Sequence, residues 1–133
     1  MAFSPLANGL PTDRYTEDTT FDSATDYRAS MPQFRRESLV RNRSLFSLVE
    51  GLAQEHRATP SQVSLAWMLN KKSRIVPILG ARHSDRLREN IGAAEIRLTP
   101  AQVKPIDAAF DAMRMSEVFG GPPIKKQPAN LKR

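Results

Sequence analysis

The sequence lacks cysteine entirely and has only two histidines among its 133 residues. Without cysteine the chain can form no disulfide framework, thiolate nucleophile or cysteine-ligated metal site, and this composition is typical of a reducing compartment. No spacing of histidine and carboxylate residues indicates a metal site, so none is predicted. We take the cytoplasm as the expected location.

Long apolar runs are also absent. No segment approaches the roughly 20 apolar residues that a membrane-spanning helix needs. The N-terminal string "MAFSPLANGL" has neither the basic region nor the apolar stretch of a secretory signal peptide. We therefore expect a soluble protein that has no membrane partner.

Positive charge, in contrast, is in excess. Lysine and arginine together number 20 against 14 aspartates and glutamates, which gives a formal net charge of +6. Long-range attraction therefore favours an anionic partner, whether nucleic acid, a membrane surface or a phosphorylated ligand. The remaining composition, 40% hydrophobic and 26% charged, is that of a globular domain with one modest core.

Apolar spacing predicts helices in four places: over 44–57, over 59–70, from Ser84 and from Thr99. The second helix is apolar almost all round, so much of its circumference should be covered. Its start, "TPSQV", has Thr59 as N-cap and Gln62 at the reciprocal position of a capping box. The last helix repeats this pattern in "TPAQV", with Thr99 and Gln102.

Two short apolar runs predict parallel strands, at Ala2–Phe3 and over 74–80, the second of them buried on both faces. Between the first strand and the first helix, residues 10–41 are rich in Asp, Thr, Ser and Arg and are predicted to form a long loop off the core. Residues 120–133 are predicted to form a flexible basic tail.

The string "PILGARHSDRLREN", residues 77–90, gathers arginines where the second strand gives way to a helix. A helix N-terminus offers unpaired N–H groups and the positive end of the helix dipole. Gly80 lets a ligand approach the backbone, and the guanidinium groups of Arg82 and Arg86 match phosphate geometry. The pattern predicts a cradle for a phosphate monoester, although a solvated arginine-rich helix face is the simpler alternative.

Four strings occur in order along the chain: "SPLANG", "DYRASMPQF", "TPSQVSLAWML" and "IVPILGARHSDRLRENIGAAEIRLTPAQV". Together they resemble the C-terminal portion of aldo-keto reductases. The resemblance implies an α/β fold over residues 1–119, the C-terminal part of a (β/α)8 barrel, with about two parallel strands and flanking helices. It also implies an oxidoreductase that transfers hydride between NADP(H) and a small carbonyl or alcohol substrate.

In that family the R-x-x-E-N string after the last strand binds the adenosine end of NADP(H). The resemblance implies that Arg86 meets the 2′-phosphate and that Glu89 and Asn90 hydrogen-bond the adenine. Three further residues would line the same phosphate: Gly80, Ala81 and Arg82. The family's usual Lys, Thr or Ser near positions 81 and 82 is absent, so the preference for NADP(H) over NAD(H) rests on the arginines.

At the N-terminus the resemblance implies contacts with the other half of the cofactor. Phe3 stands where the family has an aromatic ring on the nicotinamide, and a buried strand residue is the alternative interpretation. Contacts with the pyrophosphate and ribose are implied for Ser4, Leu6 and Asn8. The long loop would fold over the cofactor, with Arg28 and Phe34 near the ligand.

Family catalysis uses a tyrosine acid whose pKa is lowered by a lysine paired with an aspartate, beside a histidine. The four residues Tyr15, Tyr27, His56 and His83 do not stand at matching positions, so no catalytic residue is predicted here. We expect the isolated chain to be inactive and marginally stable, because two strands cannot close a barrel of eight.

Two alternatives remain from the sequence. One is a non-catalytic regulatory or binding subunit that pairs with a complementary chain or a full reductase. The other is a basic nucleic-acid-binding protein, which the lack of interleaved aromatic residues and of a known motif disfavours.

Overall fold

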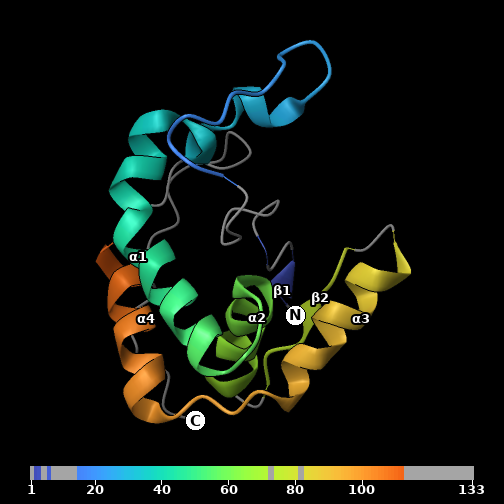
Figure 1. Cartoon of the computed structure of the whole chain (residues 1–133), viewed down its shortest axis with the longest axis vertical. Coiled ribbons are helices and arrows are strands. Elements are labelled where there is room, and N and C mark those ends of the chain that lie inside the picture. The colour runs from blue at the N-terminus through green and yellow to red at the C-terminus, as the bar shows by residue number, and fades with distance from the viewer. Residues whose placement is uncertain (1, 4–5, 7–14, 72–73, 81–82, 113–133) are drawn as a thin grey trace, which may run out of the picture.

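The computed structural model describes residues 2–3, 6, 15–71, 74–80 and 83–112. Ser4, Asn8, Ala81, Arg82 and the predicted tail at 120–133 lie outside the described residues. The elements in chain order are β1 (Ala2–Phe3), η2 (Tyr27–Ser30), η3 (Pro32–Phe34), α1 (Arg36–Glu55), α2 (Pro60–Lys71), β2 (Pro77–Ile78), α3 (Ser84–Gly92), η4 (Ala93–Glu95) and α4 (Pro100–Ala112) (Figure 1).

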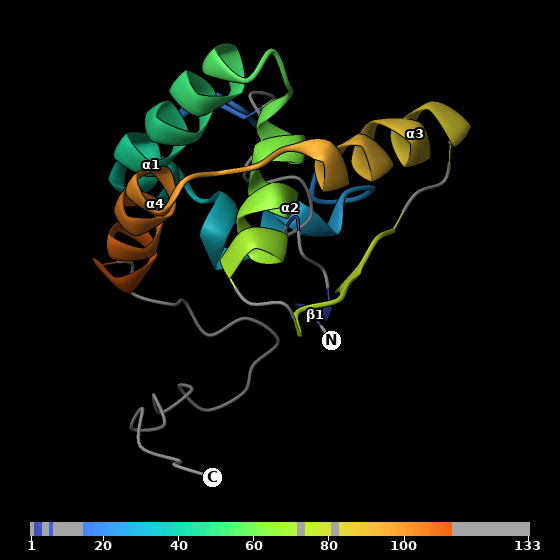
Figure 2. The ribbon, with the colours of Figure 1, turned by 90° about the horizontal axis from the view of Figure 1, so that it is seen from below.

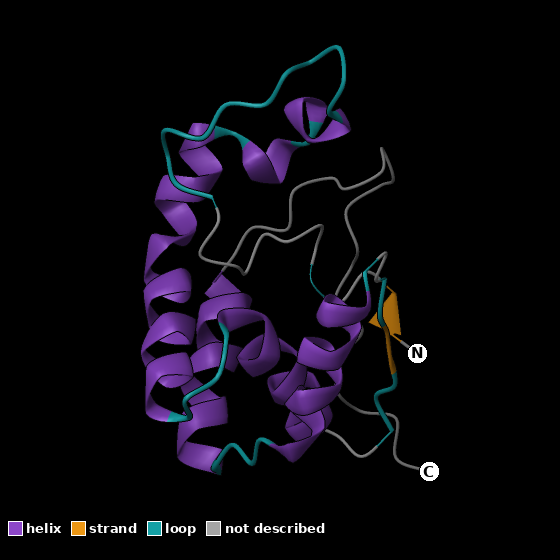
Figure 3. Cartoon of the chain, turned by 45° about the vertical axis from the view of Figure 1, so that its right-hand side comes forward, coloured by secondary structure: helices purple, strands orange, loops and turns teal. Residues whose placement is uncertain are grey.

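The strands β1 and β2 pair in parallel, as predicted, with Ala2 opposite Pro77 and Phe3 opposite Ile78. Parallel pairing requires a long crossover, which α1 and α2 supply here. The pair lies at one edge of the helices (Figure 3). The prediction that residues 74–80 form a strand buried on both faces is wrong, since β2 is short and Val76 and Ile78 are 57% and 45% exposed. A strand is buried by its neighbours, and no third strand occurs among the described residues.

Helix α2 lies at the centre of the packing, between α1 and α4 on one side and α3 on the other (Figures 1 and 2). Val63 and Ala66 on α2 have no exposed surface, which confirms that the helix is covered on most sides. The main core joins α2 to α1 and α4 through the buried residues Leu45, Val49, Leu52, Ala53, Val63, Ala66, Leu98 and Ile106. A second cluster, of Leu65, Met68 and Ala93, lies on α2 and η4.

Helix α1 begins at Arg36, well before the predicted start at residue 44. Leu39, Asn42 and Leu45 extend its buried face toward the N-terminus at helical spacing. The sequence prediction missed this part because Arg, Asn and Ser dominate it. The helix ends at Glu55, and Arg57 follows in the left-handed conformation with φ of 51°.

The prediction that residues 10–41 form a loop off the core is partly right for the described part, 15–41, since residues 15–26 form no helix or strand and no residue of this part belongs to the main core. This part contains η2, η3 and the start of α1, and it has a small core of its own. The rings of Tyr15, Phe21 and Phe34 lie with centroids 5.3 to 5.5 Å apart, and Phe34 and Leu39 are buried. Aromatic residues so far apart in sequence show no periodicity, so the pattern did not predict their contact.

Helix α3 begins at Ser84, as predicted. Its two large apolar residues, Leu87 and Ile91, lie one turn apart but are 45% and 60% exposed. The apolar side of α3 therefore faces outward among the described residues, as do Val76, just before β2, and Ile78, within β2.

Candidate functional site

The predicted phosphate cradle lies where β2 leads into α3. Leu79 and Gly80 follow β2, and His83 is the N-cap of α3 without a side-chain hydrogen bond to the helix. Among the described residues, the carboxylate of Asp85 lies in the first turn of α3, where it interacts favourably with the positive end of the helix dipole. A Cβ placed on Gly80 would meet no atom within 4 Å, so the backbone there is open to a ligand.

Arg86 and Glu89 form an ion pair on α3, with Arg86 NH1 2.7 Å from Glu89 Oε2. The Arg86 side chain is 45% exposed and the Glu89 side chain is 19% exposed. A residue pair three positions apart on a helix meets without distortion. The guanidinium group of Arg86 therefore lies at the surface, and the more buried carboxylate of Glu89 binds it.

Glu89 is also bound to the start of α2. Its Oε1 accepts a hydrogen bond from Thr59 Oγ1 at 2.8 Å, and its main-chain oxygen accepts one from Gln62 Nε2 at 2.8 Å. Thr59 and Gln62 also form the predicted capping box, with Gln62 N donating to Thr59 Oγ1 and Thr59 N donating to Gln62 Oε1. Sequence reasoning missed the connection to Glu89, which lies 30 residues from Thr59.

Asn90, the next residue of the predicted R-x-x-E-N group, is buried, with 6% of its surface exposed. The structure therefore places Arg86 and Glu89 together at the surface of α3 and Asn90 below it. A contact between Asn90 and an adenine stays a prediction.

The parallel register brings the N-terminal residues to the same end of the sheet. Phe3 is opposite Ile78, so the segments that follow β1 and β2 both leave from the carboxyl ends of the two strands. Leu6 is half-buried and packs against the cluster that contains Leu65 and Met68. The structure therefore gives Leu6 a packing role, and its predicted contact with the cofactor remains untested.

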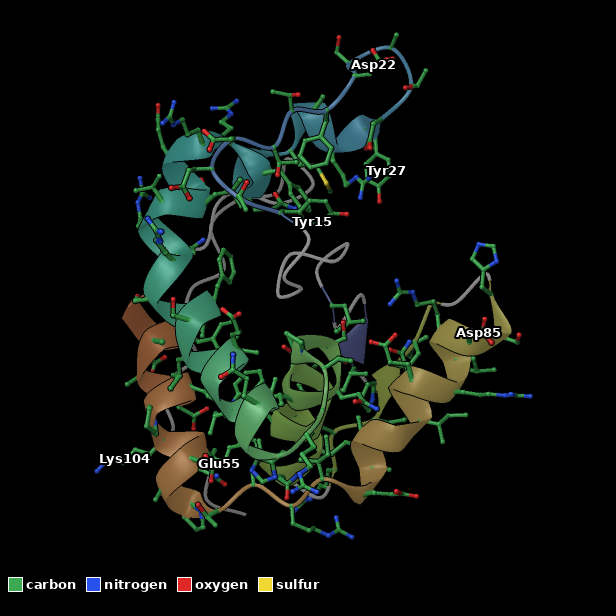
Figure 4. The ribbon with its side chains drawn as sticks, viewed as in Figure 1. Tyr15, Asp22, Tyr27, Glu55, Asp85 and Lys104 are labelled. Atoms are coloured by element: carbon green, nitrogen blue, oxygen red, sulfur yellow. The ribbon has the colours of Figure 1, made fainter. Side chains whose placement is uncertain are left out.

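Arg28 is held within the 15–41 segment. Its guanidinium group donates to both carboxylate oxygens of Asp26 and to the hydroxyl of Tyr15, and its central carbon lies 4.9 Å from the centroid of the Phe21 ring. The hydrogen bonds from Arg28 lower the pKa of Asp26 below its usual value. Figure 4 shows Tyr15 and Tyr27 in this segment, beyond the N-terminal end of α1. Arg28 and Phe34 thus contact other residues of the same segment, and their predicted position near the ligand stays a prediction.

A separate hollow of about 320 Å³ lies between α2 and α4. It is lined by Asn70, Lys71, Leu98, Pro100, Val103, Lys104 and Asp107. Inside it Lys71 Nζ lies 2.7 Å from Asp107 Oδ1, and Trp67 Nε1 donates to the same oxygen at 2.9 Å. Lys71 and Trp67 together lower the pKa of Asp107, with Lys71 the larger cause.

The two tyrosines lie together near Arg28 in the 15–41 segment, whereas the two histidines lie at the end of α1 and at the start of α3. Tyr15 is bound to Arg28, and His56, at the end of α1, lies 3.1 Å from the Gln102 side chain. His83 is exposed at the start of α3, and Tyr27 lies on η2. Within the described ranges, no group of three or more His, Asp or Glu side chains could hold a metal ion, and no helix is long and apolar enough to cross a membrane.

Comparisons with known proteins place these observations in a family. The sequence model of the aldo/keto reductase family matches residues 1–111. The chain is 34% identical over 120 residues to the aldo-keto reductase yakc [NADP(+)] of Schizosaccharomyces pombe, covering 90% of this chain and 34% of that protein. It is 38% identical over 90 residues to the probable aldo-keto reductase 1 of Glycine max, covering 68% of this chain and 25% of the relative.

A third relative, the aldo-keto reductase str7 of Strobilurus tenacellus, is 33% identical over 106 residues, covering 80% of this chain and 31% of the relative. The chain thus spans between a quarter and about a third of the length of these curated relatives.

Proposed function

Since this chain belongs to the aldo/keto reductase family, we propose that it forms the cofactor-binding part of an oxidoreductase that transfers hydride between NADP(H) and a carbonyl or alcohol substrate. In this proposal its strands and helices are the C-terminal part of a (β/α)8 barrel, whose sites lie at the carboxyl ends of the strands. The parallel pairing of β1 and β2 supports this placement.

The observation that carries the proposal is the exposed guanidinium group of Arg86, fixed by Glu89 in the early part of α3. An arginine next to a helix N-terminus binds phosphate by direct hydrogen bonds and by charge. The 2′-phosphate distinguishes NADP(H) from NAD(H), so Arg86 would favour the phosphorylated cofactor. The relative from Schizosaccharomyces pombe carries NADP(+) in its name, which supports this choice.

The remaining cofactor contacts are proposed from the resemblance. Gly80, with open space around it, would line the phosphate together with Ala81 and Arg82. Phe3 would meet the nicotinamide. Three residues would contact the pyrophosphate and ribose: Ser4, Leu6 and Asn8. The carboxyl ends of the parallel strands β1 and β2 lie side by side. This supports a single cofactor site, because the segments that follow the two strands start at the same edge of the sheet.

We further propose that the Asp, Tyr, Lys and His of family catalysis are not among these 133 residues. The chain covers only 34% of the length of the Schizosaccharomyces pombe relative, which supports this proposal. The hydrogen bond that the Tyr15 hydroxyl accepts from Arg28 supports it as well. The exposed apolar residues Val76, Ile78 and Leu87 agree with a chain whose barrel neighbours lie elsewhere.

Direct binding of the reduced cofactors tests the proposal. NADPH and NADH are titrated into the 133-residue chain, with quenching of the single tryptophan, Trp67, and calorimetry as readouts. We expect NADPH to bind more tightly than NADH, and we expect no turnover of an aldehyde. Failure to bind NADPH, alone or together with a complementary N-terminal barrel part, would contradict the cofactor role. Turnover by the chain alone would contradict the proposed absence of the catalytic residues.

A further inference from the structure

We propose that Thr59 and Gln62, the capping pair of α2, are positioning residues for the 2′-phosphate subsite. They act through Glu89, whose carboxylate holds the guanidinium group of Arg86. This inference rests on the proposed function of Arg86 and deepens it, because it names the residues that set the direction of the guanidinium group.

Three hydrogen bonds restrain Glu89. Its Oε1 accepts from Thr59 Oγ1 at 2.8 Å, its Oε2 from Arg86 NH1 at 2.7 Å, and its main-chain oxygen from Gln62 Nε2 at 2.8 Å. Both carboxylate oxygens are therefore engaged, and the side chain is only 19% exposed. Because Thr59 fixes one carboxylate oxygen of Glu89, the other oxygen can hold the Arg86 guanidinium group in one orientation.

Gly92 provides an independent sign that this contact is built into the fold. A Cβ placed on Gly92 would lie 2.7 Å from Gln62 Nε2, closer than side chains tolerate. The Gln62 amide reaches the main chain of α3 because Gly92 leaves space for it. Gln62 Oε1 meanwhile accepts the N–H of Thr59, so one side chain joins the start of α2 to α3.

The second "TPxQV" string offers an internal comparison. Thr99 and Gln102 make the same reciprocal cap at the start of α4, with Thr99 N donating to Gln102 Oε1 at 2.9 Å and Gln102 N donating to Thr99 Oγ1 at 3.3 Å. Gln102 Nε2, however, donates to Glu55 Oε1 at 2.8 Å, where α4 meets the end of α1 (Figure 4). Capping is common to both strings, whereas the connection to Glu89 belongs to the first.

The consequence concerns discrimination between phosphorylated and unphosphorylated ligands. A guanidinium group that is already oriented loses less side-chain freedom when it binds phosphate. Loss of the Thr59 hydroxyl would free one end of Glu89, and Arg86 would then have to be ordered by the ligand. Affinity for a ligand with the 2′-phosphate should therefore fall by a larger factor than affinity for one without it, because any contact between Glu89 and the adenine is common to both ligands.

The test measures binding of 2′,5′-ADP and of 5′-AMP to the full chain by calorimetry. Thr59→Val should weaken 2′,5′-ADP binding by about fivefold, the effect of one hydrogen bond, and leave AMP binding within about twofold. Thr99→Val, which removes the same cap from α4, should leave both affinities unchanged. Thr59→Ser, which keeps the hydroxyl, should bind 2′,5′-ADP and 5′-AMP with the wild-type affinities.

Gly92→Ala provides a second variant, in case Thr59→Val does not fold. It moves the Gln62 amide away from Glu89 and leaves both capping threonines in place. We expect it to lower the preference for 2′,5′-ADP over AMP in the same direction.

Three results would overturn the inference. Equal losses in Thr59→Val and Thr99→Val would assign the effect to capping alone. An unchanged preference for 2′,5′-ADP over AMP in Thr59→Val and Gly92→Ala would remove the positioning role while leaving Arg86 in place. A wild-type chain that binds AMP as tightly as 2′,5′-ADP would overturn the phosphate role of Arg86 and this inference with it.

Discussion

The indole ring of Trp67 lies against the ring of Phe110, with centroids 4.6 Å apart and planes 13° from parallel. The contact joins α2 to α4, and Lys71 Nζ lies 4.8 Å from the centroid of the same indole ring. Trp67 is the single tryptophan of the chain, so its fluorescence reports directly on this packing.

Removal of the Phe110 ring should loosen the contact between the two helices. We expect Phe110→Ala to lower the free energy of unfolding by about 2 kcal/mol, since the ring is partly buried and an aromatic pair adds to the burial of its area. Urea unfolding followed by Trp67 emission measures the loss. Phe110→Tyr keeps the ring and serves as the control. A change below about 0.5 kcal/mol in Phe110→Ala would show that the stacking adds little.

Asp107 should contribute stability at neutral pH that acid removes. Lys71 and Trp67 lower its pKa from the usual value of 3.8. The folded state therefore binds the proton less tightly than the unfolded state, and the stabilisation is fully present above about pH 4 and disappears as the pH falls through the lowered value.

The comparison that isolates this effect is Asp107→Asn. Because the pair is about a third exposed, we expect the wild type to exceed the variant by about 1 kcal/mol or less at pH 7. The difference should shrink toward pH 2, and thermal unfolding across this range measures it. A difference that stays constant with pH would show that the carboxylate charge is not responsible.

Arg57 is a site where a simpler residue should stabilise the chain. It holds the left-handed conformation, with φ of 51°, just after α1, and glycine adopts this conformation without the steric cost of a Cβ. Arg57→Gly should raise the free energy of unfolding by about 0.5 to 1 kcal/mol. Arg57→Ala, which also removes the charge but keeps the Cβ, should give no such gain. Equal gains in the two variants would assign the effect to charge.

The outward apolar side of α3 should promote self-association of the isolated chain. Replacement of Leu87 and Ile91 by serine should reduce association in sedimentation experiments, while the free energy of unfolding changes by less than about 1 kcal/mol. Val40→Ser, at a single exposed position on α1, is the control and should leave association unchanged. A large loss of stability in the double variant would show that both residues are already buried in this chain.

Local sequence signals predicted much of the fold. The capping pattern at Thr59 located the start of α2, and the transition after Gly80 located α3, because caps and helix starts depend on a few adjacent residues. The start of α1 and the aromatic cluster around Phe34 were missed, since both depend on contacts between distant side chains. The burial expected for β2 was wrong because burial of a strand requires neighbouring strands. The residues of β2 alone do not indicate whether such neighbours are present.

The candidate site divides in the same way. Arg86 could be singled out because arginines gather between Gly80 and the first turns of a helix, whereas Glu89 was implied by the family resemblance alone. The hydrogen bond from Thr59 to Glu89 could not be predicted, because it depends on how α2 packs against α3.

The central claim is that Arg86 binds the phosphate that distinguishes NADP(H) from NAD(H). The most direct measurement compares NADPH and NADH affinities of Arg86→Met with those of Arg88→Met, an exposed arginine of the same helix that gives the same change of charge. We predict that Arg86→Met weakens NADPH binding by about 10- to 100-fold, as expected for hydrogen bonds between charged groups, and leaves NADH binding unchanged. Arg88→Met should change neither affinity by more than about threefold. Equal effects of the two variants on NADPH, or no effect of Arg86→Met, would contradict the claim.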